Sequence, residues 1–187
     1  KHGEDIHSKT ASQIFDVDIK DVTSKQRIEA KAINFGIIYG KTDFGLSQDL
    51  NIPVATAKAY IDSYFNKYPK IKEFMDEAVE SATETGYATT ILNRRRYIPE
   101  IKASNFIVRN QGKRFAMNAP IQGSAADIIK VAMVNVYNKL KENNMKSKLI
   151  LQVHDELIVE AVDEELEMAE KIVREEMENA QSMDVKL

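Results

Sequence analysis

Apolar residues recur at intervals of three and four along most of the chain, which is the spacing that one buried face of an α-helix requires. Thr23 and Gln26 stand at the spacing of a capping box, so a helix is expected to begin just after Thr23. Proline and glycine mark where other helices end. The predicted helices are one that follows Thr23, one that stops at Pro69, one that stops at Gly86, one over about 125–140, and one that Asp163 caps.

Two segments depart from the helical period. "YATTILNRRRYIP" (87–99) places Thr, Ile and Tyr on either side of Asn93, which predicts a short hairpin with arginines at its turn. "KLILQV" and "LIVEA" are strand-like runs on either side of "HDE" (154–156), which predicts a second hairpin. The expected fold class is therefore α+β, rich in helices and with a small antiparallel sheet. We find no internal repeat and no Pro/Gly/Ser-rich linker that would divide the chain.

Length and composition narrow the class of protein. With 187 residues, 43% of them hydrophobic, the chain has the composition of a soluble globular protein. No apolar run approaches the roughly 20 residues of a membrane helix, and the first residues lack a signal-peptide core. The absence of cysteine excludes disulfides and thiolate metal sites. We therefore expect a cytoplasmic protein that does not bind membranes.

The formal net charge of −3 conceals a segregation of charge along the chain. Residues 94–114 include seven basic residues and one acidic residue, whereas residues 155–178 include eleven acidic and two basic residues. A chain that sorts its charge in this way can meet a polyanion with its basic surface. A basic loop beside a solvated acidic helix would produce the same pattern, and charge alone does not separate the two interpretations.

Four residues in "RIEAKAINFGIIYG" form a row with a spacing of four. Each step of four turns about 40° around a helix, so the row slants slowly along about 18 Å of the axis. Two cations followed by two aromatic rings suit a ligand with an anionic end and flat rings, such as a nucleoside triphosphate. Alternatively, the cations are solvated and the rings belong to the core. The row consists of Arg27, Lys31, Phe35 and Tyr39.

The "HDE" segment places two carboxylates at the tip of the second predicted hairpin. Neighbouring side chains of an extended strand point to opposite faces, so Asp155 and Glu156 cannot easily bind one cation together. A two-metal phosphoryl-transfer site needs carboxylates from separate strands, which hold two ions about 4 Å apart. The segment is thus either part of a cation site or simply a turn rich in polar residues.

A third group of polar residues follows the basic segment. Arg114, Asn118 and Gln122 are spaced by four, and amides beside a cation can contact the acceptor atoms that every base pair presents in the minor groove. Pro120 and Gly123 would equally mark a junction between two helices.

Taken together, these segments resemble the polymerase domain of family A DNA polymerases. Arg27 to Gly40 fits the family motif R-x3-K-x3-F-x3-Y-G, and "QVHDE" fits its motif with the catalytic Asp-Glu. "GEDIHSKTASQIF", "NRRRYIP" and "NAPIQGSAADIIK" occur in the family's order, so the likeness spans nearly the whole chain. It implies a helix-rich fingers subdomain with part of an antiparallel palm sheet. Residues 1–100 would be mainly fingers helices ending in the basic hairpin, and residues 101–187 the palm-side helices, the HDE hairpin and a terminal helix.

The resemblance also implies roles for individual residues. His7, Arg27 and Lys31 would bind the triphosphate of the incoming deoxynucleotide, Phe35 would pack against its sugar and base, and Tyr39 would stack at the templating position. Asp155, supported by Glu156, would ligate catalytic Mg²⁺, of which the complete site holds two ions, and Lys31 would join these carboxylates in catalysis. Residues implied to contact DNA are Gly40, Arg94, Arg95, Arg96, Arg114, Asn118, Gln122 and His154.

The implied activity is nucleotidyl transfer to a primer 3′-hydroxyl in DNA replication and repair, by a monomer bound to primer-template DNA and deoxynucleoside triphosphates. The family's second essential aspartate would precede "KHGEDIH", so the 187-residue chain alone is expected not to polymerise. The alternative from another class is a noncatalytic nucleic-acid-binding or helical interaction module in which "HDE" is only a turn. A nuclease that uses Asp155 would need more clustered acidic residues than the hairpin offers.

Overall fold

The structure is a computed structural model that describes residues 5–185 and residue 187. The chain forms two compact units, His2–Ile121 and Gln122–Leu187, and the boundary lies inside the long helix α6 (Phe106–Glu142). The division into fingers at 1–100 and palm side at 101–187 concerns family subdomains rather than compact units, and it stays a prediction.

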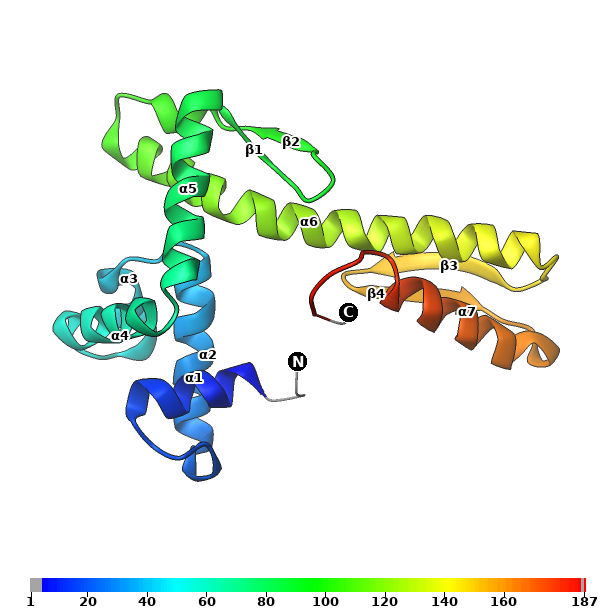
Figure 1. The fold of residues 1–187 in the computed structure, drawn as a ribbon, viewed down its shortest axis with the longest axis horizontal. Helices are drawn as coiled ribbons and strands as arrows, with labels where there is room; N and C mark the ends of the chain where they lie inside the picture. Colours follow the sequence, from blue (N-terminus) through cyan, green and yellow to red (C-terminus); the bar gives the residue numbers. More distant parts are fainter. Residues whose placement is uncertain (1–4, 186) are drawn as a thin grey trace. The chain divides into compact units, whose positions relative to one another are not determined.

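The first unit is built from helices and one small hairpin (Figure 1). Helix α1 lies against α2, and α3 and α4 form a neighbouring pair. Its elements, besides the start of α6, are α1 (Ile6–Phe15), the 3-10 turn η1 (Ile19–Asp21), α2 (Ser24–Ile38), α3 (Asp43–Leu50), α4 (Val54–Lys67), α5 (Pro69–Thr85), β1 (Tyr87–Thr89), β2 (Arg95–Tyr97) and the 3-10 turn η2 (Pro99–Lys102).

Local signals in the sequence set the ends of these helices as predicted. The Thr23 hydroxyl accepts from the Gln26 backbone N–H at 3.2 Å, while the Thr23 N–H donates to the Gln26 side chain at 2.9 Å, which completes the capping box of α2. Pro69 is the first residue of α5, where its missing N–H costs no helical hydrogen bond. Gly86 ends α5 with a φ of 83°, a conformation that glycine adopts without a steric penalty.

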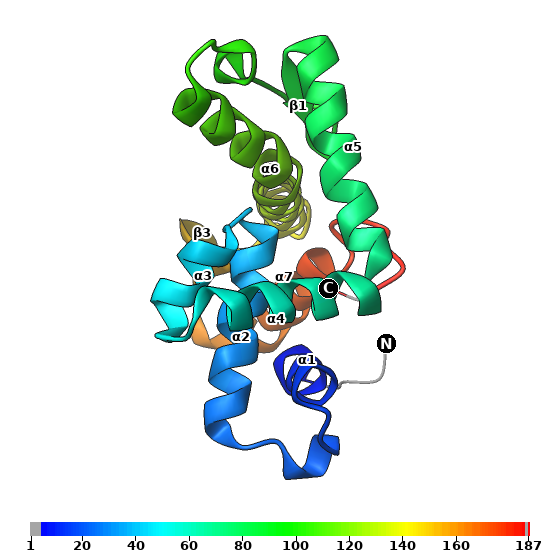
Figure 2. The same ribbon diagram turned by 90° about the vertical axis from the view of Figure 1, so that its left-hand side faces the viewer.

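Two apolar clusters stabilise the first unit. One joins α2 to its neighbours through Ile33 and Ile37, which pack with Leu46 of α3 and Tyr64 of α4. In the other, α5, the β1–β2 hairpin and the first half of α6 lie together (Figure 2). This second cluster consists of Ala82, Ala88, Ile98, Ile101, Ala116 and Ala119.

Helix α6 is longer than the sequence predicted. The apolar stripe indicated a helix over about 125–140, with Pro120 and Gly123 as a possible junction, but the structure continues the helix from Phe106 to Glu142 with Pro120 inside it. A proline within a helix costs about 3 kcal/mol through its missing N–H and its ring. Ala116 and Ala119, both buried next to Pro120, hold this segment against the rest of the first unit, so packing outweighs the local penalty.

The second unit has the end of α6, the hairpin of β3 (Lys148–Val153) and β4 (Glu156–Glu160), the 3-10 turn η3 (Asp163–Glu165), and α7 (Leu166–Glu178) (Figure 1). Val136 and Leu140 of α6 and Ile172 of α7 pack with the inward residues of the hairpin. The opposite face of the hairpin is exposed, including Leu151 and Ile158, which are paired across the strands. Two small antiparallel sheets in a helical chain confirm the predicted α+β class.

The prediction that Asp163 caps the last helix is wrong. Asp163 is the first residue of η3, and α7 begins three residues later without a side-chain cap. The Glu165 carboxylate at the start of α7 instead accepts from the N–H groups of Lys146 and Ser147, at 2.9 and 2.8 Å. This carboxylate therefore fastens the loop before β3 rather than the end of its own helix. In the described part of the chain, no helix is long and apolar enough to span a bilayer.

Candidate functional site

Helix α2 presents the row of four to the outside and its apolar residues to the core. Ile33 and Ile37 are buried because they pack against α3 and α4, and Ala30 is buried as well. The row residues on the other side are exposed, including the two rings, Phe35 at 43% and Tyr39 at 42%. The interpretation that these rings belong to the core is thus wrong, and they are available to a ligand.

The row forms a continuous strip of cations and rings. The Phe35 and Tyr39 rings are stacked, with centroids 6.1 Å apart and planes inclined by 11°. The Lys31 Nζ atom lies 6.0 Å from the centre of the Phe35 ring, and the His7 ring lies 5.7 Å from it at an angle of 50°. Helix α1 therefore adds His7 to the strip, next to the Phe35 ring.

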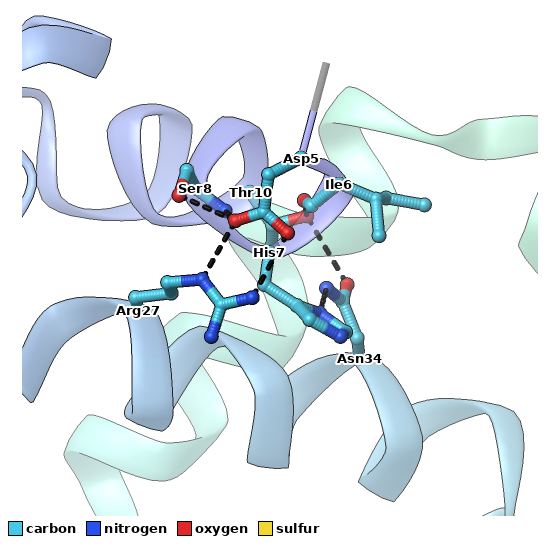
Figure 3. A network of polar contacts seen from close by, with 7 residues as sticks. All are labelled: Asp5, Ile6, His7, Ser8, Thr10, Arg27 and Asn34. Carbon is cyan, nitrogen blue, oxygen red and sulfur yellow. Dashed lines mark hydrogen bonds and ion pairs between the residues drawn. The ribbon is translucent and has the colours of Figure 1, made fainter. Parts of the chain in front are cut away.

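A polar network connects α1 to α2 at the cationic end of the strip (Figure 3). The Arg27 guanidinium donates to both carboxylate oxygens of Asp5, from Nε at 2.8 Å and from Nη2 at 3.1 Å. Asn34 lies between Thr10 and His7, with its Nδ2 atom 3.0 Å from His7 Nδ1. Arg27, His7 and Phe35 are thus held by neighbouring side chains from two helices.

Sequence interpretation missed Asp5 and Asn34. Asp5 carried a local signal, because it precedes Ser8 by three residues and accepts from its backbone N–H as an N-cap. Asn34 also carried a local signal, because it is a polar residue on the apolar side of α2, one helical turn after Ala30. Neither signal identifies the distant partner, which only the packing of α1 on α2 supplies.

Gly40 follows the row and packs closely against α6. Its φ is 67°, and a Cβ atom there would lie 2.5 Å from Met117 Cε and 3.3 Å from Arg114 Cγ. A residue with a side chain would therefore be strained and would push on both neighbours. This close approach places Arg114 beside the end of the row.

The basic hairpin β1–β2 stacks two of its arginines on aromatic rings. The Arg95 guanidinium lies 4.7 Å from the centre of the Tyr87 ring, and that of Arg96 lies 4.5 Å from the Phe115 ring. Arg94 lies between the turn and β2, whereas Arg95 and Arg96 belong to β2, so the arginines follow the turn rather than form it. Stacking holds a guanidinium plane while leaving its edge able to donate to an anion.

On α6, the three polar residues spaced by four differ in exposure. Arg114 and Gln122 are exposed, whereas Asn118 is half-buried, and its Oδ1 atom is buried without a hydrogen-bond partner among the described residues. Arg114 and Asn118 belong to the first compact unit, and Gln122 begins the second. The helical junction considered for this segment is absent, so all three follow one helix.

In the second unit, His154 and Asp155 form the turn between β3 and β4, and Glu156 begins β4. All three are exposed, and His154 has a φ of 52°, a conformation uncommon for residues other than glycine. Asp155 lies at a cavity of about 520 Å³ that is lined mainly by apolar residues of α6 and α7, such as Ile128 and Met177. The Asp155 carboxylate can therefore reach solvent or a bound cation.

These carboxylates do not complete a metal site. Among residues 5–185 and 187, no three His, Cys, Asp or Glu side chains are grouped so that they could hold a metal ion. Asp155 and Glu156 are adjacent in sequence. Asp155 lies in the turn, and Glu156 is the first residue of β4. Asp155 is therefore not in extended backbone, and the expectation that these two residues cannot easily bind one cation together stays a prediction.

Comparison with known proteins gives a consistent result. The sequence model of DNA polymerase family A matches residues 1–187. DNA polymerase I of Caldicellulosiruptor bescii is 54% identical over 187 residues, which is all of this chain and 22% of that protein. DNA polymerase I of Bacillus subtilis is 53% identical over 183 residues, 98% of this chain and 21% of that protein. The chain thus spans about a fifth of the length of these relatives.

A solved structure has the same fold. It is the polymerase domain of Pol1 from M. smegmatis in complex with DNA primer-template and dNTP, with a TM-score of 0.94 and 45% sequence identity. The match covers 99% of this chain and 33% of that one.

Proposed function

Because the chain belongs to DNA polymerase family A, we propose that it is the part of a template-directed DNA polymerase that binds the incoming deoxynucleoside triphosphate and contacts the primer-template. The observation that carries this proposal is the strip of cations and rings that α2 presents outward from a buried apolar face. The similar Pol1 domain of M. smegmatis binds both DNA primer-template and dNTP, which supports these two partners.

The chemistry of the strip fits a nucleotide. Arg27 and Lys31 offer N–H donors at one end and His7 offers another beside the Phe35 ring, and charge-assisted hydrogen bonds to phosphate oxygens are among the strongest that proteins make. The stacked rings of Phe35 and Tyr39 offer flat apolar surface at the other end, where a sugar and base would pack. Triphosphate and base would thus bind in the order in which the row presents cations and rings.

The nucleic acid would bind through the basic hairpin and α6. Arg94, Arg95 and Arg96 would contact backbone phosphates, and such contacts position a duplex without reading its sequence. Arg114 would act beside Gly40, which the structure packs against it. The remaining proposed DNA contacts are Asn118, Gln122 and His154.

We propose Asp155 and Glu156 as the carboxylates that this chain supplies to a Mg²⁺ site. Exposed carboxylate oxygens are the ligands that Mg²⁺ prefers, but the donor set of the described residues is too small for two ions. We also propose two-metal catalysis in replication and repair, and this mechanism requires further carboxylates from other parts of the polymerase. Monomeric state and cytoplasmic location stay predictions.

Carboxylates exposed at the HDE turn fit both the polymerase and the noncatalytic alternative, a nucleic-acid-binding or interaction module, because polar residues are common in turns. The two functions differ in their ligand, because only a polymerase needs a triphosphate site on α2. We expect Lys31→Ala, in the polymerase that contains this chain, to raise the KM for deoxynucleotide about tenfold to a hundredfold, since one hydrogen bond to a charged group contributes about 1.5–3 kcal/mol.

The matched control is Lys25→Ala. Lys25 is on the same helix and is exposed, but it does not belong to the row. Its Nζ atom lies 3.9 Å from Glu29 Oε1. The control should leave the KM unchanged within about twofold, because an exposed ion pair contributes little. Equal KM values for Lys31→Ala and the unchanged enzyme would contradict the proposed site.

A further inference from the structure

Asn34 is a polar residue in an apolar environment. Its exposed fraction is 5%, and it lies on the side of α2 that carries Ala30, Ile33 and Ile37, all of them buried. A buried amide is costly unless its donors and acceptor are paired, so an amide retained here needs specific partners. Its partners come from α1, more than 20 residues away in sequence.

The contacts orient the amide. The Thr10 hydroxyl, itself 1% exposed, lies 3.2 Å from Asn34 Oδ1 and 2.9 Å from the Ile6 carbonyl oxygen, and these two acceptors share its single hydrogen. With Oδ1 facing that donor, the Nδ2 atom of Asn34 faces His7 Nδ1 at 3.0 Å. The amide nitrogen can only donate, so His7 Nδ1 accepts.

This contact decides where the imidazole carries its proton. A neutral histidine has one protonated and one unprotonated ring nitrogen, and the partner of one nitrogen selects the tautomer. Because Nδ1 accepts from Asn34, Nε2 carries the proton of the neutral ring and is a donor. The Phe35 ring, 5.7 Å away, restricts the orientation of the imidazole from another side.

We propose that Asn34 is a positioning residue of the triphosphate subsite: its amide holds His7 in the tautomer and orientation in which Nε2–H donates to a phosphate oxygen. The proposal rests on the proposed triphosphate-binding role of His7. An anion needs a donor, and the opposite tautomer would present a lone pair to the phosphate instead. Asn34 acts through His7 and makes no contact with the ligand itself.

The first test measures the tautomer directly. In ¹⁵N-labelled chain, at a pH where the ring is neutral, we expect the ¹⁵N shifts and two-bond couplings of His7 to show an unprotonated Nδ1 and a protonated Nε2. In Asn34→Asp, the new carboxylate can only accept, so the proton should move to Nδ1. A protonated Nδ1 in the unchanged chain would overturn the proposal, and this measurement requires no variant to fold.

The second test uses a double-mutant cycle in the polymerase that contains this chain. We expect Asn34→Ala to raise the KM for deoxynucleotide about fivefold to tenfold, as the weakening of one charge-assisted hydrogen bond would, with a smaller effect on kcat. In a His7→Ala background the same change should alter the KM less than about twofold. An undiminished effect in that background would mean that Asn34 does not act through His7, and would overturn the proposal.

Two further comparisons separate the possible failures. Ser47→Ala removes another buried hydroxyl of the first unit, 2% exposed and bonded to the Phe44 carbonyl oxygen, and should leave the KM unchanged. If His7→Ala alone leaves the KM unchanged, the triphosphate role of His7 fails, and the positioning role fails with it. If His7→Ala raises the KM while Asn34→Ala does not, only the positioning role is overturned.

Discussion

Asp5 binds Arg27 through two parallel hydrogen bonds, Nε to Oδ2 at 2.8 Å and Nη2 to Oδ1 at 3.1 Å, so that the residue that caps α1 also fastens α1 to α2. The Arg27 side chain and then the Ser8 hydroxyl hold the pKa of the Asp5 carboxyl well below its usual range. One carboxylate thus joins the start of a helix to the cationic end of the proposed triphosphate site.

The Asp5–Arg27 pair should make stability depend on pH in the acidic range. The Asp5 pKa is lowered in the folded chain, so its contribution is fully present above the ordinary value of 3.8 and is lost as pH falls below it. We expect the difference in thermal midpoint between the unchanged chain and Asp5→Asn to be constant from pH 7 to about pH 5, and to narrow below pH 4. The pair is exposed, so the difference should be small and should shrink in high salt. A difference that grows on acidification would contradict this assignment.

Gly112 is expected to tolerate no side chain. A Cβ atom at Gly112 would lie 2.5 Å from the Ile101 backbone nitrogen and 2.7 Å from its Cα, and backbone cannot move aside as a flexible side chain can. Gly112→Ala should therefore lower the free energy of unfolding by about 1–3 kcal/mol or more, although alanine favours helices over glycine by about 1 kcal/mol.

The matched control for this substitution is Gly45→Ala in α3. The nearest atom to a Cβ there is Thr42 Oγ1 at 3.6 Å, an ordinary contact. Denaturant titrations of both variants should show no loss for Gly45→Ala and a clear loss for Gly112→Ala. Equal stabilities would mean that α6 does not pack this closely on η2.

Glu165 should stabilise the second unit in a pH-dependent way. Its carboxylate accepts from the Ser147 hydroxyl at 2.6 Å and from the N–H groups of Lys146 and Ser147, and these bonds lower its pKa from the usual 4.5. The stabilisation is present above pH 4.5 and disappears as pH falls through the lowered pKa. Glu165→Gln should lower the thermal midpoint at pH 7, whereas Glu164→Gln, at an exposed neighbouring position, should not. If both variants melt alike, the Glu165 contacts do not stabilise the unit.

Asp155 should be essential for primer extension, and the 187-residue chain should not extend a primer by itself. The described residues expose Asp155 and Glu156 but group no third acidic ligand with them. In the polymerase that contains this chain, Asp155→Ala should lower kcat by more than about a hundredfold, beyond the effect of changing an outer-shell partner, while DNA binding is retained. Glu167→Ala, an exposed carboxylate on α7, is the control. Primer extension by the purified 187-residue chain with Mg²⁺ and four deoxynucleotides would contradict the prediction that this chain is inactive by itself.

Much of the fold followed from local pattern. The Thr23–Gln26 box, Pro69 and Gly86 each act within one turn of their own position, so their effect is readable from neighbouring residues. Helical periodicity also separated the row on α2 from Ile33 and Ile37, but it left open whether the rings of the row are exposed, which the packing of α2 decided. Asp163 shows the limit of local patterns. It was predicted to cap the last helix, but the carboxylate that accepts backbone hydrogen bonds there is that of Glu165, and its donors are 18 and 19 residues away.

By itself, then, the sequence determined the helices α2, α4, α5 and α7, the second half of α6, both hairpins and the apolar face of α2, and, through its ordered motifs, the family. It did not predict α1 or α3. Only the tertiary structure decided that α6 continues through Pro120, that Asp5 pairs with Arg27, and that Asn34 contacts His7. The physical reason is range: backbone conformation and amphipathic spacing depend on residues a few positions apart. A buried amide or an interhelical ion pair instead depends on side chains that only the packing of one helix on another brings within about 3 Å of each other.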